Sequence, residues 1–192
     1  MRKSRHISAL SFLGVMLLAL VAVFPGSASG DSADSRDSAT ATLRDANGNV
    51  VGRVVFGTSG DSVVVAARVS TASAGFHGFH VHAVGVCQAP FTTAGGHHNP
   101  GGATHGDHAG DMPVLLVQQD GTANSAFETD RFTVNSLFDA DGSAVIVHFD
   151  EDNYANIPSR YVSSTTGTAG PDSATLATGD AGARFACGVV TR

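Results

Sequence analysis

The chain has 192 residues, which suits a single domain with its own core. Its formal net charge of −6 argues against nucleic acids and anionic membrane surfaces as partners. Glycine is abundant (23 residues) and tryptophan is missing, a composition that favours short strands and tight turns over long helices.

Residues 1–30 have the features of a secretory signal peptide. Arg2, Lys3 and Arg5 give a positive start, residues 10–24 are an apolar stretch, and residues 26–30 offer small residues for cleavage. A retained anchor is the alternative, but the apolar stretch is shorter than the ~20 residues that a spanning helix needs. We therefore expect export to a periplasm, a cell wall or the medium, with no membrane contact after cleavage.

Cleavage would leave eight basic residues against 17 acidic ones, a net charge of −9, because no acid lies in residues 1–30. Lys3 is the only lysine, so every remaining basic side chain is an arginine. Residues 31–39 are small, polar and charged and predict a disordered leader before a domain spanning 40–192.

From residue 40 onward the pattern is that of short strands between turns such as Asn47-Gly48-Asn49. Two long polar segments, 83–111 and 150–180, interrupt it, and loops of this length are usually functional. The sequence pattern therefore predicts an all-β fold, namely an eight-stranded antiparallel barrel or sandwich with two long functional loops. The predicted strands are 41–44, 50–56, 62–69, 76–82, 112–119, 122–128, 144–149 and 183–190.

The chain contains two cysteines, Cys87 and Cys187. An even pair in an exported protein predicts one disulfide, with two buried free thiols as the alternative.

The motif His80-Val81-His82 lies in a predicted strand, where residues two apart point to the same face. Two imidazoles side by side form half of a metal site, and His148 at the end of another apolar strand can supply a third ligand. Imidazole ligation on a rigid sheet suits Cu(II), which prefers a nitrogen-rich field.

The first long loop carries a second constellation, namely His97, His105, His108 and Asp111. Three imidazole nitrogens and one carboxylate oxygen suit tetrahedral Zn²⁺. Four protein ligands leave no open position, which indicates a structural zinc and argues against a zinc hydrolase. A purely structural adhesion domain would leave the histidine cluster unexplained.

With these residues in place, the sequence resembles the copper/zinc superoxide dismutase family across nearly all of residues 40–192. The matching stretches are GFHGFHVH (75–82), AGGHHNP (94–100), HGDHAGD (105–111), VIVH (145–148) and TGDAGARFACGV (178–189). The resemblance implies a Greek-key arrangement of the strands. The segment Asp152–Pro158 is similar to the exported bacterial branch.

The resemblance also implies roles for individual residues. It makes His80, His82, His97 and His148 the copper ligands, and His97, His105, His108 and Asp111 the zinc ligands. His97 would bridge the two metals.

Further roles follow from the same resemblance. Arg184 is implied as the active-site cation, Asp152 as a carboxylate that hydrogen-bonds ligands of both metals, and Cys87–Cys187 as the family disulfide. Thr178 is similar to a residue that lines the substrate channel. His77 matches a structural histidine, and His98 receives no role.

The implied activity is dismutation of superoxide to oxygen and hydrogen peroxide, with copper alternating between Cu(II) and Cu(I). His97 and Arg184 would be the catalytic residues. The alternative is an exported copper- and zinc-binding module, a sink or chaperone-like domain without turnover. Whether the protein is a monomer or a homodimer stays open at this stage.

Overall fold

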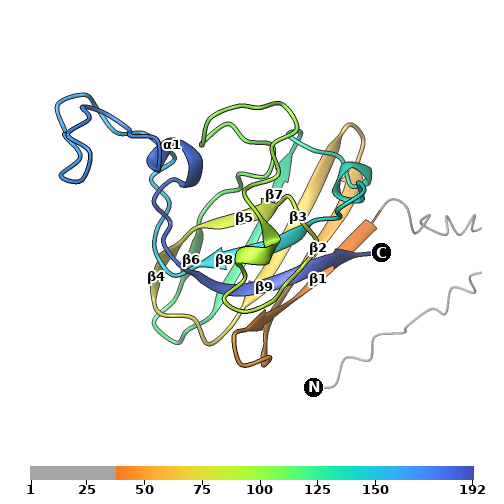
Figure 1. The fold of residues 1–192 in the computed structure, drawn as a ribbon. Coiled ribbons are helices and arrows are strands. Elements are labelled where there is room, and N and C mark those ends of the chain that lie inside the picture. Colours follow the sequence, from red (N-terminus) through yellow and green to blue (C-terminus); the bar gives the residue numbers. More distant parts are fainter. Residues whose placement is uncertain (1–37) are drawn as a thin grey trace, which may run out of the picture. The chain divides into compact units, whose positions relative to one another are not determined.

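The computed structural model describes residues 38–192, so the predicted signal peptide and leader residues 31–37 lie outside it. The described part is almost entirely β (Figure 1). Its helical elements are two 3₁₀ turns at Thr92–Ala94 and Asn135–Leu137 and the one-turn helix α1 at Thr175–Thr178. Its strands are β1 (Ser38–Asp45), β2 (Val50–Ser59), β3 (Ser62–Val69), β4 (Gly75–His77), β5 (Phe79–His82), β6 (Leu115–Val117), β7 (Ala123–Thr129), β8 (Ala144–His148) and β9 (Arg184–Thr191).

Seven strands form one antiparallel sheet in the order β5-β8-β9-β1-β2-β3-β7, and β4 pairs with β6 in a small second sheet. Strand β4 runs almost directly into β5 at one edge of the large sheet, while β6 leads through a tight turn into β7 at the other edge. The small sheet thus connects both edges, so the large sheet must curl. This confirms the prediction of an all-β antiparallel fold.

The core lies inside this curled sheet. In β1, β2 and β3 buried residues alternate with exposed ones, as expected where one face meets the core and the other meets water. Leu43, Val54, Phe56 and Val65 point inward and have no exposed surface. Full burial of such a side chain contributes about 1.5–3 kcal/mol.

Strands β5 and β8 differ, because every one of their residues is buried. Their inward residues, among them Phe79 and Val147, belong to the main core. On the outward face, Ile146 packs with Phe91 and Ala94 in a second, smaller cluster. The long loop after β5 therefore covers the outside of the sheet (Figure 1). Histidines on that face are consequently shielded from bulk water.

The structure corrects the predicted strand 76–82, which divides at Gly78 into β4 and β5. A side chain at Gly78 would collide with Ala181 and press on the ring of His80. The backbone of Gly78 is instead bonded to His148 and Asp150 at 2.8 Å each. Glycine therefore allows the chain to change sheets beside the histidine cluster.

Three smaller differences follow from local chemistry. The predicted strand 112–119 shortens to β6, because Pro113 has no N–H for a sheet ladder. Helix α1 forms inside the second long loop, where the Asp172 carboxylate accepts the N–H groups of Ala174 and Thr175 at 3.1 Å. Strand β1 begins at Ser38, two residues before the predicted start of the domain. No helix within residues 38–192 is long and apolar enough to cross a membrane.

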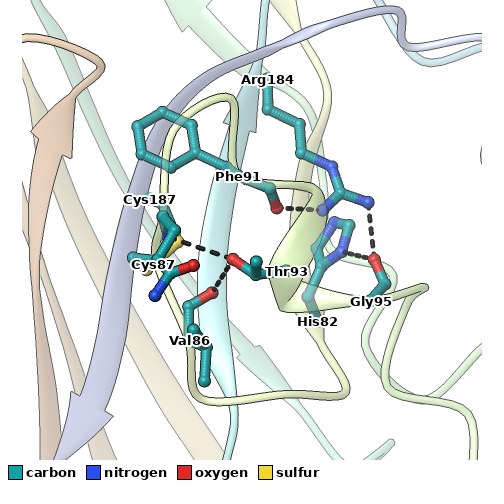
Figure 2. The surroundings of a disulfide bond; sticks show 9 residues. His82, Val86, Cys87, Phe91, Thr93, Gly95, Arg184 and Cys187 are labelled. Atoms are coloured by element: carbon teal, nitrogen blue, oxygen red, sulfur yellow. Dashed lines mark hydrogen bonds between the residues drawn. A yellow bond between two sulfur atoms is a disulfide. The ribbon is translucent and has the colours of Figure 1, made fainter.

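The predicted disulfide between Cys87 and Cys187 is present and joins two positions that are 100 apart in the sequence. It fastens the start of the long loop to β9, as Figure 2 shows. Closing a loop of this length restricts the unfolded chain.

We expect replacement of both cysteines by serine to lower the free energy of unfolding by about 4–5 kcal/mol in the chain-entropy account. Urea denaturation of the metal-free protein measures it, with the unaltered protein under reducing conditions as the matched control. Equal urea midpoints for the oxidised protein and the double variant would contradict this expectation.

Candidate metal centre

Two imidazoles of β5 and one of β8 lie on the loop-covered face of the sheet. His80, His82, His97 and His148 are all buried, and each offers a ligand atom within 4.8 Å of the others. The ring of His97 stacks on that of His80 with centroids 4.0 Å apart. The sequence prediction that these four residues meet is therefore matched by the geometry.

One nitrogen of each sheet histidine is held by an acceptor. His80 Nε2 lies 2.6 Å from Asp152 Oδ2, His82 Nδ1 lies 2.9 Å from the Gly95 carbonyl, and His148 Nδ1 lies 3.1 Å from the Gly182 carbonyl. These acceptors fix the N–H on the named nitrogen, so the other nitrogen carries a free lone pair.

The remaining nitrogens, His80 Nδ1, His82 Nε2 and His148 Nε2, are buried and have no hydrogen-bond partner in residues 38–192. A buried polar atom without a partner is costly, on the order of 1–3 kcal/mol. Three lone pairs within 4.8 Å of one another are a donor set that a cation can occupy. This arrangement fits a nitrogen-rich metal ion such as copper.

The second group lies beside the first and shares His97. His97 Nδ1 is 2.8 Å from Asp111 Oδ1, 3.3 Å from His105 Nδ1 and 3.2 Å from His108 Nδ1. Ligands at zinc–ligand distances of 2.0–2.1 Å would lie about 3.3 Å apart in a tetrahedron. These four atoms therefore fit a tetrahedral zinc ion.

His80, His97, His105 and Asp111 also approach one another within 4.8 Å. His108 fits this group better than His80 does, because His108 Nδ1 lies 3.2 Å from His97 Nδ1 and 3.3 Å from Asp111 Oδ1, whereas the free Nδ1 of His80 belongs to the first donor set.

Asp152 connects the two groups. Its side chain is fully buried, and its two oxygens lie 2.6 Å from His80 Nε2 and 2.8 Å from His105 Nε2. Burial alone would raise the pKa of Asp152, but the hydrogen bonds from His105 and His80 hold that pKa well below its ordinary value. The carboxylate is therefore ionised and orients one imidazole of each group.

Arg184 begins β9 and pairs in register with His148 across the sheet. Its guanidinium donates to the carbonyl oxygens of Phe91 and Gly95, the second bond being 2.6 Å long (Figure 2). The two loop carbonyls thus hold the positively charged guanidinium in a fixed position beside the histidines.

A pocket of about 370 Å³ opens over this cluster. Thr178 of α1 lines the pocket, as the family resemblance implied. Asp180 adds a carboxylate to the pocket wall. The lining residues are His82, Gly96, His97, His148, Ala177, Thr178, Asp180, Gly182 and Arg184.

Two further histidines within residues 38–192 belong to neither group. His77 is buried and connects two backbone carbonyl groups: its Nδ1 lies 2.7 Å from the carbonyl oxygen of His148, and its Nε2 lies 2.8 Å from that of Ser73. His98 is also buried, and its Nε2 has no partner among the described residues.

Several contributors to this site had no signal in the sequence. The carbonyls of Gly95 and Gly182 act through the backbone, which sequence patterns do not reveal. Arg131, which contacts the loop that carries His105 and His108, is one of ten arginines dispersed along the sequence.

Comparison with known proteins identifies the family. Residues 50–190 match the family model of copper/zinc superoxide dismutase. The chain belongs to the copper/zinc superoxide dismutase family. Membership implies copper and zinc as the metals, in agreement with the two donor sets.

Among relatives in this superoxide dismutase family, a protein of Mycolicibacterium paratuberculosis named superoxide dismutase [Cu-Zn] is 40% identical over 127 residues, 60% of this chain and 56% of its own length. A Mycobacterium bovis protein of the same name is 39% identical over 168 residues, 82% of this chain and 66% of its own length. The chain thus spans less than two thirds of these relatives. An extracellular superoxide dismutase [Cu-Zn] of Brugia pahangi is 31% identical over 159 residues and is covered over 75% of its length.

Solved structures agree with the family fold. A double mutant of a SOD-like protein from Bacillus subtilis superposes with a TM-score of 0.63 at 28% identity, covering 78% of this chain and 95% of that one. The clock protein EA4 superposes with a TM-score of 0.65 at 24% identity, covering 80% and 93% of the two chains, and shares the fold.

Protonation of the histidines gives the metal-free protein a defined pH dependence. Desolvation lowers the pKa of His80 to about 4 and that of His148 to about 3. Between these values and the ordinary 6.5 the unfolded chain binds more protons, so stability should fall as pH drops below 6.5. His105 opposes this trend. Desolvation lowers its pKa, but hydrogen bonds to Asp111 and Asp152 outweigh this and raise the pKa to about 9. Protonated His105 therefore stabilises the fold below pH 6.5, and this stabilisation is lost as the pH rises from 6.5 to 9.

We therefore expect the melting temperature of the chelator-treated protein to be highest near neutrality and to fall by several degrees between pH 7 and pH 5. Calorimetry across this range measures it, with the metal-loaded protein as a reference. A melting temperature that rises steadily from pH 7 to pH 4 would contradict the expectation.

Proposed function

We propose that this protein dismutates superoxide, with copper held by His80, His82, His97 and His148 and zinc held by His97, His105, His108 and Asp111. The observation that carries the proposal is the convergence of three buried, unpartnered imidazole nitrogens next to a pocket that a fixed guanidinium lines together with two of these histidines. A metal-binding pocket alone would need no cation beside it, whereas an anionic substrate does.

Copper, when bound, supplies the redox chemistry by alternating between Cu(II) and Cu(I) while one superoxide is oxidised to O₂ and a second is reduced. Two protons accompany the reduction, so that two superoxide ions and two protons yield oxygen and hydrogen peroxide.

The chain's own residues bind and orient the substrate and deliver a proton. Arg184 offers a charge that needs no reorganisation, because two backbone carbonyls already hold its guanidinium. His97 has Nδ1 directed at Asp111, which leaves Nε2 as the atom that can carry a proton to reduced substrate.

Attraction of the anion is the demanding part of this function. The chain would carry a net charge of −9 after removal of residues 1–30. The pocket is lined by one cationic side chain, Arg184, and one acidic side chain, Asp180. A low-dielectric pocket concentrates the field of a buried charge, so a local positive potential can prevail over the net charge.

Metal analysis combined with a superoxide consumption assay tests the proposal. We expect about one copper and one zinc per chain and turnover near the diffusion limit. Both metals without turnover would indicate a binding module instead, and a chain that retained neither metal would overturn the ligand assignment.

We also propose that the protein is exported, supported by the disulfide and by the signal-like residues 1–30. N-terminal sequencing of protein recovered outside the cytoplasm should give a start near residue 31, and recovery of protein that still begins at Met1 would contradict it.

A further inference from the structure

The turn that carries two of the proposed zinc ligands, His105 and His108, is held on both of its sides. On its inner side, the N–H groups of Gly106 and His108 donate to Asp111 Oδ2 at 2.9 and 3.0 Å. Both bonds use Oδ2, which also lies 3.3 Å from His105 Nδ1, while Asp111 Oδ1 faces His97 and His108. The inner side of the turn is thereby fixed to the zinc ligand set.

The outer side of the same turn is held by Arg131. Its Nη1 donates to the carbonyl oxygens of Gly106 at 2.7 Å and His108 at 3.3 Å, and its Nη2 lies 3.5 Å from Asp107 Oδ1. The Asp107 pair is exposed and contributes little. The bonds to the carbonyls are charge-assisted and fix the planes of two peptide groups.

Arg131 is itself well anchored. Its backbone N–H donates to Thr129 Oγ1 at 3.3 Å, and the next residue, Phe132, is buried in the core with its ring 6.0 Å from that of Phe56. The guanidinium therefore extends from a rigid base, unlike an arginine on a free loop.

We propose that Arg131 is a positioning residue for zinc, which holds the turn in its ligand-ready shape before the metal binds. The turn is clamped between a carboxylate and a guanidinium, so its imidazoles need little reordering when zinc arrives. Preorganisation of this kind raises affinity by reducing the ordering cost. The inference rests on the proposed zinc assignment.

Zinc affinity of the full-length oxidised chain tests it, measured by competition with a chelating dye in the absence of copper. We expect Arg131→Ala to bind zinc about tenfold more weakly, the lower end of the range for residues that support metal ligands. Arg131→Lys should lie in between, because an ammonium can replace the charge and the donors that Nη1 supplies to the two carbonyls, but not the planar guanidinium or its Nη2 contact with Asp107. Arg160→Ala is the matched control, since Arg160 stacks on Tyr161 in the second long loop.

A second readout separates positioning from general stability. Cobalt(II) in place of zinc gives an absorption spectrum that reports tetrahedral distortion, and we expect it to change in Arg131→Ala but not in Arg160→Ala. Unchanged zinc affinity and cobalt spectrum in Arg131→Ala would overturn the inference, even if its melting temperature fell. Should Arg131→Ala not fold, Arg131→Lys decides by the same two measurements. Failure of the unaltered chain to bind zinc would instead overturn the proposed function.

Discussion

Replacement of Arg184 by glutamate should slow superoxide consumption by more than about 100-fold while copper and zinc both stay bound. Removing a preorganised charge from a reaction site typically costs 10²–10³-fold. The substitution also reverses the field at the pocket, where Asp180 already contributes a negative charge. Pulse radiolysis measures the rate, and metal analysis of the same sample verifies the content.

Two variants make this result interpretable. Arg68→Glu on the exposed face of β3 changes the net charge by the same amount, and β3 is separated from β5 and β8 by at least three strands in the sheet order, so we expect a near-normal rate. Arg184→Lys keeps the charge but loses the fork that spans the Phe91 and Gly95 carbonyls, so an intermediate rate is expected. A normal rate in Arg184→Glu would remove this residue from the mechanism.

Replacement of Asp152 by asparagine should weaken metal binding by about 10–100-fold, the usual effect of removing a carboxylate that orients metal-binding imidazoles. An amide has only one acceptor oxygen, so either His80 Nε2 or His105 Nε2 would face an NH₂ group. Because the carboxylate serves both groups, copper and zinc should both be affected. Chelator competition for each metal measures the effect.

The adjacent Glu151 provides the control. It is exposed, and Glu151→Gln removes the same charge one residue away without touching either histidine. Wild-type affinity for both metals in Asp152→Asn would contradict the bridging role of this carboxylate.

The parts of the site that follow from residue type and spacing could be predicted from the sequence. His80 and His82 share a face because strand side chains alternate, and the short spacing from His105 to Asp111 constrains three ligands to one turn. The parts that arise from packing could not. Asp152 stands in a run of three acids, where residue type and spacing do not distinguish it; the family resemblance indicated it, and the fold shows that it is the buried one. Arg131 reaches its partners across more than twenty residues of sequence, and no pattern indicates that contact.

The limits of the strands also divide into those that local sequence patterns predict and those that packing determines. The alternation in β1, β2 and β3 is strong because one face meets water, and these strands were predicted within a few residues. The split at Gly78 depends on the approach of Ala181 from a distant loop and of His148 from β8, which a local pattern does not contain.

The Gly95 carbonyl, which accepts from both His82 Nδ1 and Arg184 Nη2, also restricts how this chain can change in length (Figure 2). The segment between Cys87 and Gly95 is closed by the disulfide at one end and by these two hydrogen bonds at the other. An inserted residue would displace an imidazole and the guanidinium together. The largely exposed stretch 159–169 contributes to neither histidine group, so we expect insertions and grafted peptides to be tolerated there.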